Sequence, residues 1–334
     1  MEEKKEPIEP IEQAEAKKQN KKKTLRGTVK TMPPRVPMLC ALVVTVLLLV
    51  LRIWQLTSNT NMETGFFLER NFFVYLFFVV AVAGSLATLV LSFLCGKMPS
   101  NEMSEIKRPL SGIASLAMAA GFGYETMQLF SSLQSEAIEG LSLYESCSAN
   151  GTILPFLEVI FGAVPALCLV LYTAACFVGK YTWLKFPAVL LLAGPLWGFC
   201  RVVSYFTITT SYLVNAELFC ELYAAVFMML FLFYFARLVT GTSAEPIAWL
   251  TVGMGLVAAM MCLLASVPRM VCALLGAGVV QDYTVDGIYL AGCFFCIVIV
   301  LSTVIKGVPD RVEAAPIADA DDGGDIPVEP FTVE

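Results

Sequence analysis

The chain alternates long apolar runs with short polar stretches, and this pattern predicts helices that cross a membrane. A helix needs about 20 apolar residues to span a bilayer. Eight runs meet or approach that length, and they cover residues 37–58, 72–96, 110–133, 153–178, 184–207, 216–239, 246–268 and 287–306. A further apolar stretch at 269–281 follows Pro268, where we expect the helix to break because proline lacks an amide donor. We interpret that stretch as an interfacial or re-entrant segment.

The composition supports a membrane location. Of the 334 residues, 57% are hydrophobic and 15% are charged, whereas soluble domains carry about 25% charged residues. The first run follows a long polar segment and exceeds the apolar part of a signal peptide, so we interpret it as a retained helix. The predicted fold class is all-α, a polytopic membrane protein with about eight transmembrane helices.

The distribution of Lys and Arg predicts the orientation, because these residues are enriched in cytoplasmic loops. Ten of them precede the first run, and only Arg70 and Arg269 lie between runs on the opposite side. The others on the first side are Lys97, Lys107, Arg108, Lys180, Lys185, Arg237, Lys306 and Arg311. We therefore expect an integral protein of the plasma (cell) membrane with both termini in the cytoplasm.

The eight runs are arranged as four tandem helical hairpins, each of which begins and ends on the cytoplasmic side. Their ends are similar, with Gly96–Lys97, Gly179–Lys180, Thr240–Gly241 and Lys306–Gly307. Parallel repeats of this kind are one way to build a transporter, although Gly and Lys at cytoplasmic helix ends also occur without any repeat. The transmembrane domain covers residues 36–307.

Two charged tails flank this domain, and both are predicted to be disordered and cytoplasmic. Residues 1–35 form a basic tail, and residues 308–334 form an acidic tail with eight carboxylates against Arg311. Both are poor in aromatic residues. The basic cluster next to the first helix favours contact with anionic lipid, unless it serves topology alone. It lacks the aromatic residues and the surrounding fold that are typical of nucleic-acid binding.

Three polar cassettes with one pattern lie near the ends of three apolar runs. Each has a charged residue, a polar residue three positions later and a hydroxyl six positions later. They are Arg52–Gln55–Ser58, Glu125–Gln128–Ser131 and Arg201–Ser204–Thr207, which recur 73 and 76 residues apart. A charge within an apolar helix is costly and usually functional. We interpret the cassettes as parts of one shared polar layer.

Helix depth places the charges of this layer at one level. Arg52, Glu125 and Arg201 each lie about 15 residues from their cytoplasmic entry, which corresponds to about 22 Å across a core of about 30 Å. Three glutamates on the returning helices reach a similar depth. The candidate binding residues are Arg52, Glu125, Gln128, Glu158, Arg201, Ser204, Tyr205, Glu217 and Glu221.

The charges of the predicted layer do not balance, since four carboxylates face two guanidiniums. We expect Arg201 to pair with Glu125 or Glu221, whereas Arg52 either joins the layer or extends outward to the interface. The excess carboxylates favour binding of a proton, a cation or an amine. Alternatively, the layer is a structural set of ion pairs that fixes helix register.

The sequence disfavours an enzyme, because it contains no His at all and no phosphate-binding loop. We predict no catalytic residues, no metal and no cofactor, and we interpret Cys293 and Cys296 as packing residues. Cys147 and Cys272 lie near outer loops and could form a disulfide. The preferred function is a transporter or a membrane solute-binding subunit for a small polar solute or cation, with a possible partner subunit. The alternative is a membrane sensor, assembly or interaction protein in which the layer is structural.

Overall fold

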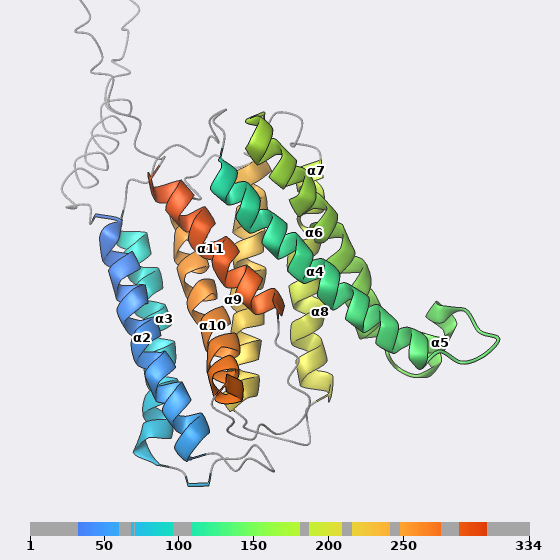
Figure 1. The fold of residues 1–334 in the computed structure, drawn as a ribbon, viewed down its shortest axis with the longest axis horizontal. Coiled ribbons are helices and arrows are strands. Elements are labelled where there is room, and N and C mark those ends of the chain that lie inside the picture. The colour runs from blue at the N-terminus through green and yellow to red at the C-terminus, as the bar shows by residue number, and fades with distance from the viewer. Residues whose placement is uncertain are drawn as a thin grey trace, which may run out of the picture.

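The described parts of the chain are helical and pack side by side in one bundle (Figure 1). The computed structural model describes residues 33–59, 68–69, 71–95, 108–180, 187–208, 216–240, 248–274 and 287–305. The helices are α2 (Arg35–Ser58), α3 (Phe72–Leu94), α4 (Pro109–Ser135), α5 (Leu143–Ala149), α6 (Ile153–Val178), α7 (Pro187–Leu190), α8 (Ala193–Ile208), α9 (Ala216–Thr240), α10 (Ala248–Leu274) and α11 (Gly287–Ile305). The predicted tails lie outside the described residues, except for residues 33–35.

Every predicted apolar run contains a helix, but the run at 184–207 is divided. The helix α7 ends at Leu190 and α8 begins at Ala193. Pro195 is the third residue of α8, where the missing amide donor costs little because the first turn of a helix leaves its donors unsatisfied. Pro195 therefore lies in the first turn of a helix, whereas Pro165 lies inside α6, which continues through it.

The predicted helix break at Pro268 is wrong. Helix α10 passes through Pro268 and ends only at Leu274. A proline removes a single backbone donor, and neighbouring helices in membrane proteins commonly compensate for that loss. Here the segment after the proline is held by an ion pair between Arg269 and Glu221 of α9 and by the buried Cys272. The remaining residues of the expected re-entrant segment, from 275 onward, lie outside the described parts.

Six helices of the described chain are long and apolar enough to cross a membrane, which indicates an integral membrane protein. They are α2, α3 and α6 with the segments Leu218–Thr240 of α9, Trp249–Cys272 of α10 and Gly287–Val304 of α11. Helix α4 has 27 residues but is rich in Gly, Ala and Ser, and α8 has 16 residues. Eight spans in four tandem hairpins therefore stay a prediction.

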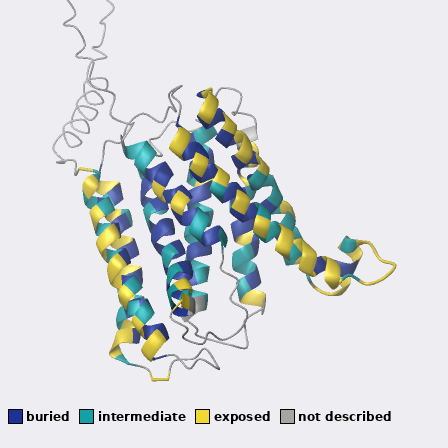
Figure 2. Cartoon of the chain, in the orientation of Figure 1, coloured by how far each residue is buried: buried dark blue, intermediate teal, exposed yellow. Residues whose placement is uncertain are grey.

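Six helices form a closed cycle of contacts, which we call the six-helix ring. Helix α4 packs against α6, α6 against α8, α8 against α9, α9 against α10, α10 against α11, and α11 against α4. Helices α2 and α3 pack against each other and against α10, and they lie at one side of the bundle (Figure 1). Buried residues concentrate on α9 and α10, whereas α2, α4 and α6 present exposed faces (Figure 2).

An aromatic cluster fills one part of the ring, and it consists of Tyr172, Phe231, Phe235 and Phe295. All four side chains are fully buried. The ring of Phe235 lies 5.3 Å from that of Tyr172 and 5.1 Å from that of Phe295, both in edge-to-face geometry. This arrangement suits the charge distribution of aromatic rings. The cluster joins α6, α9 and α11 without using charge.

Candidate functional site: a polar layer in the six-helix ring

Every helix of the six-helix ring contributes a polar side chain to one network, which we call the polar layer. Its members are Glu125 of α4, Glu158 of α6, Arg201 and Tyr205 of α8, Glu221 of α9, Arg269 of α10 and Tyr289 of α11. They lie in the C-terminal halves of α4, α8 and α10 and in the first two turns of α6, α9 and α11. The layer therefore crosses the ring near one of its ends.

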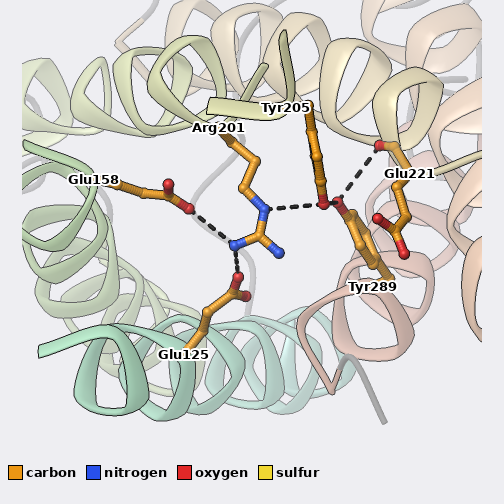
Figure 3. A network of polar contacts seen from close by, with 6 residues as sticks. All are labelled: Glu125, Glu158, Arg201, Tyr205, Glu221 and Tyr289. Atoms are coloured by element: carbon orange, nitrogen blue, oxygen red, sulfur yellow. Dashed lines mark hydrogen bonds and ion pairs between the residues drawn. The ribbon is translucent and has the colours of Figure 1, made fainter. Parts of the chain in front are cut away.

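Arg201 is the centre of one half of the layer (Figure 3). Its Nη1 donates to the carboxylates of both Glu125 and Glu158, with 2.9 Å to Oε1 of Glu158. Its Nε donates to the hydroxyl of Tyr205, one turn further along α8, at 3.3 Å. Bonds between a guanidinium and a carboxylate are among the strongest hydrogen bonds in proteins. Three helices, α4, α6 and α8, thus meet at one side chain.

The second terminal nitrogen of Arg201, Nη2, contacts neither of the two carboxylates. Nη2 points away from both carboxylates in Figure 3, and it makes no hydrogen bond to any described residue. The Arg201 side chain keeps 17% of its surface exposed. A guanidinium offers two donors on this nitrogen. The centre can therefore donate to an additional oxygen acceptor without losing a bond that it already makes.

Aromatic and small residues form an apolar floor beneath Arg201. Trp197 lies one turn earlier on α8, is 2% exposed, and has its ring centroid 5.9 Å from the guanidinium carbon. The ring of Phe122 meets Trp197 edge-on at 4.9 Å. Gly162 permits this packing, because a Cβ there would lie 2.6 Å from Oγ1 of Thr126 and 3.3 Å from Cδ1 of Trp197. The floor thus packs α4, α6 and α8 together next to Arg201.

Two tyrosines connect Arg201 to the second half of the layer. The hydroxyls of Tyr205 and Tyr289 lie 3.2 Å apart, and the Tyr289 hydroxyl donates weakly to the backbone oxygen of Glu221 at 3.5 Å. Either hydroxyl can be the donor in the bond between them. Glu221 in turn forms an ion pair with Arg269. The two tyrosines thus link Arg201 to the Arg269–Glu221 pair.

The structure brings five of the nine predicted site residues together in this layer. They are Glu125, Glu158, Arg201, Tyr205 and Glu221. Arg201 pairs with Glu125, one of its two expected partners, and also with Glu158. Glu221, the other expected partner, pairs with Arg269 instead.

The other four predicted residues lie elsewhere or are not described. Arg52 lies on α2, outside the six-helix ring, where its Nη1 donates to Oε1 of Gln55 at 3.4 Å. It is 2% exposed and so does not extend outward. Gln128 is exposed and donates to the hydroxyl of Tyr124 on its own helix at 2.7 Å. Ser204 is buried, and its Oγ has no hydrogen-bond partner among the described residues. The side chain of Glu217 lies outside the described parts.

The first cassette lies on α2, outside the six-helix ring, so the idea that all three cassettes share one layer stays a prediction. The second and third cassettes supply Glu125 and Arg201, which meet. Arg52 has the same spacing and a similar depth, but α2 packs on α3 and α10 and takes no place in the ring. Spacing along a helix sets the depth of a side chain, whereas the partner helix is set by packing between helices.

Sequence reasoning missed two residues of the layer, Arg269 and Tyr289. Arg269 was interpreted only as a charge that marks the outer side, beyond a helix that was expected to end at Pro268. Tyr289 is the third residue of α11 and was not considered. Arg269 lies near the C-terminus of α10 and Tyr289 near the N-terminus of α11, so both lie at the end of the bundle where the layer was predicted. Comparing the depth of every polar residue, tyrosines included, would have found them.

The described residues offer few means of holding a metal. No group of three or more His, Cys, Asp or Glu residues among them could bind an ion. Cys262, Cys293 and Cys296 are buried in α10 and α11, and Cys147 of α5 is buried without a disulfide, so it is not joined to the described Cys272. The chemistry of the layer is therefore that of carboxylates, guanidiniums and phenols.

A separate carboxylate outside the spanning helices serves as a reference. Ser142 caps α5, and its hydroxyl and backbone amide donate to Oε2 of Glu145 at 2.7 and 3.0 Å. Hydrogen bonds that stabilise a carboxylate favour its charged form. The bond from the Ser142 hydroxyl, followed by that from the amide, lowers the pKa of Glu145.

Comparisons with protein-family models, curated proteins and solved structures found no match to this chain.

Proposed function

We propose that this protein is a multi-pass membrane transporter, or the solute-binding membrane subunit of a transport system, and that its polar layer binds a small polar solute or cation. The proposal includes eight spans in four tandem hairpins, both termini in the cytoplasm, and a location in the plasma membrane. The layer crosses a ring of helices that come from three of the four hairpins, α4 with α6, α8 with α9 and α10 with α11. Parallel-repeat transporters bind their substrates at the interface between repeats.

The surfaces of α4 and α8 support counting them as spans beside the six apolar helices. Both pack between helices that are long and apolar enough to cross a membrane. Their outward faces are apolar, with Leu116 and Met127 exposed on α4 and Leu196, Phe199 and Phe206 exposed on α8. Charged residues on membrane helices are expected to face the bundle interior, and Glu125 and Arg201 do so by meeting each other. Both helices thus match a lipid environment.

The observation that carries the proposal is the uncovered Nη2 of Arg201. This nitrogen is not among the buried polar atoms that lack a partner, so it reaches the exposed part of the Arg201 side chain, where a ligand can approach it. Arg201 thus keeps one terminal nitrogen open while the other binds two carboxylates. A solute with an oxygen acceptor fits that nitrogen, and a proton, a cation or an amine on the same solute fits the carboxylates.

Flux through reconstituted protein tests the proposal. Proteoliposomes adsorbed on a solid-supported membrane would receive concentration jumps of sodium chloride, sodium acetate, glycine, glutamate and lysine, and the charge movement would be recorded. Arg201→Lys keeps the charge but loses the planar fork and the Nη2 donors. We expect it to reduce the current by about tenfold or more, since a charge-assisted hydrogen bond contributes about 1.5–3 kcal/mol.

Arg52→Lys is the control, because Arg52 is a more deeply buried arginine on α2, outside the six-helix ring. We expect it to keep the wild-type current. Equal currents from both variants and the wild type, at equal protein density, would remove Arg201 from the site. A wild type that shows no current with any of these solutes above protein-free liposomes would contradict transport of this solute class.

A sensor, assembly or interaction protein is the second candidate, and one observation favours it. Arg201 ties α4, α6 and α8 together, so the layer can serve to fix the arrangement of the ring. In that case the charged tails would recruit partners. Deleting residues 1–30 and 312–334 separates the two functions. Unchanged flux in the deleted form favours transport, whereas loss of cellular activity with solute binding intact favours recruitment.

A further inference from the structure

The geometry around Arg201 places two carboxylates on one nitrogen. Glu125 and Glu158 both accept from Nη1, although they come from different helices, α4 and α6. Two acceptors on one nitrogen can be no further apart than about 6 Å, twice the usual length of a hydrogen bond. These three side chains together carry one excess negative charge when both glutamates are ionised. Two carboxylates in one partly buried site cannot both ionise without mutual repulsion.

We propose that Glu125 and Glu158 share one exchangeable proton, so that the Arg201 centre is the proton-binding site of this membrane protein. A hydronium ion supplies the proton and becomes a water molecule. The proton converts one carboxylate into a carboxyl group. That group then donates its O–H to a neighbouring acceptor while the other carboxylate keeps its bond to Nη1. The centre changes from a net charge of minus one to zero.

The groups around the pair favour a proton over a metal ion. The guanidinium nitrogen already occupies the point where the two carboxylates converge, and a metal ion there would meet its positive charge. The side chain of Glu158 is 5% exposed, and the aromatic rings of Trp197 and Phe122 pack against each other beside Arg201. A proton needs no coordination shell and fits this space.

The other titratable and charged groups near the pair leave this assignment in place. Tyr205 faces Arg201 from α8, and Tyr289 reaches Tyr205 from α11. The buried thiol of Cys200, also on α8, lies close enough to interact with the charge of Glu158. Glu221 and Arg269 lie beyond the tyrosines and form their own ion pair. On α5, Glu145 is exposed and engaged by Ser142. Among the described residues, Arg201 is thus the cation that directly contacts both Glu125 and Glu158.

The inference concerns the same centre as the proposed function and gives it a coupling ion. A neutral centre would accept a solute with an anionic oxygen on Nη2 of Arg201 more readily than a negative one would. Binding of the proton and of such a solute would therefore support each other, and the reciprocity of linked binding requires the effect to be mutual.

Infrared spectroscopy of the purified full chain in nanodiscs tests the proposal directly, with neither solute nor gradient present. A protonated carboxyl group has a carbonyl stretching band that is distinct from the carboxylate bands. We expect this band in the wild type near neutral pH, and we expect it to titrate away at alkaline pH. A wild type without the band near neutral pH would overturn the proposal, whatever any variant does.

Single variants assign the band to the pair. In Glu125→Gln and in Glu158→Gln, Arg201 keeps one carboxylate and the charges balance, so we expect the band to be lost in both. A band that survives in either variant belongs to a single residue and would overturn sharing. Glu125→Asp retains two carboxylates and should retain the band, which guards against loss through misfolding. Glu145→Gln is the control and should leave the band unchanged.

Two further outcomes complete the test. Replacing potassium by sodium at constant pH and ionic strength should leave the band intact, and its loss in sodium would assign the site to a metal cation instead. The band and the flux are measured separately. A retained band without flux would contradict the proposed function alone, whereas flux without the band would contradict the proton alone.

Discussion

The polar layer and the aromatic cluster hold the same ring of helices together by different physics. The side chains of the Arg201–Glu125 and Arg269–Glu221 pairs keep 15–19% of their surface exposed, whereas the four side chains of the aromatic cluster are fully buried. Within a bilayer, helices gain little from hydrophobic association and depend on close packing and polar contacts. One part of the ring is therefore held together by close packing of aromatic side chains, and the other by ion pairs and hydrogen bonds. The charged part is the one that pH or a polar solute can alter.

Removing the cation of the layer should have the largest effect on stability. Arg201→Leu leaves Glu125 and Glu158 without their shared guanidinium. Breaking a buried pair by removing one partner costs about 3–5 kcal/mol. We expect a clearly lower midpoint of thermal unfolding for the purified variant in detergent at neutral pH. The loss should shrink at acid pH, where both carboxylates are protonated.

The double variant Arg201→Leu with Glu158→Gln checks the cause. It leaves one carboxylate in place of two, so we expect it to unfold at a higher temperature than Arg201→Leu alone. If Arg201→Leu unfolds at the wild-type temperature at neutral pH, the layer does not hold the ring together, and the contrast with the aromatic cluster fails.

Disturbing the aromatic cluster should cost less and should not depend on pH. Phe235→Leu removes edge contacts with Tyr172 and Phe295. Each aromatic pair contributes about 0.5–1.5 kcal/mol beyond its buried area, so we expect a loss of about 1–3 kcal/mol. Unfolding midpoints would be compared across pH with those of the wild type. A pH-dependent difference would mean that the cluster and the layer do not stabilise the ring independently of each other.

The floor beneath Arg201 lies between these two regions and offers a matched pair of glycines. Gly162→Ala would bring a Cβ within 2.6 Å of Oγ1 of Thr126, so the Thr126 side chain or the helices α4 and α6 must shift. In Gly123→Ala the new Cβ meets nothing within 4 Å. Alanine is the better helix former by about 1 kcal/mol. We therefore expect Gly123→Ala to raise the unfolding midpoint slightly and Gly162→Ala to lower it. The same sign for both would contradict the close approach at Gly162.

The sequence was sufficient to predict where the helices lie but not how they are arranged. Apolar length located α2 and α6 within two residues of their observed bounds, because the membrane-spanning requirement is a local one. The effect of Pro268 was misjudged, because the contact that holds the following turn comes from Glu221, 48 residues away along the chain. Local reasoning contains no information on such a contact.

The site was predictable to the same degree. The depth of Glu125, Glu158 and Arg201 follows from a constant rise per residue, and these three residues do meet. Arg52 has the same pattern and a similar depth, yet it lies on α2, outside the ring. A repeat in the sequence therefore predicts level but not position around the bundle. That position depends on close approaches such as Gly121 against the backbone of Ile288, where a Cβ would lie 3.2 Å from the Cα atom.

The smallest expected effect concerns Glu145, which provides a reference for the carboxylates of the layer. Its folded pKa is lowered by the bonds from Ser142, so its contribution to α5 is fully present above the ordinary pKa of glutamate, about 4.3. The contribution is lost as the pH falls through the lower folded value. We expect hydrogen exchange of residues 142–150, corrected for intrinsic rates, to speed up only in that acid range. Ser142→Ala should abolish the change. A transition of this segment near neutral pH would instead show that α5 responds to the polar layer, and the two carboxylate environments would then no longer be separate.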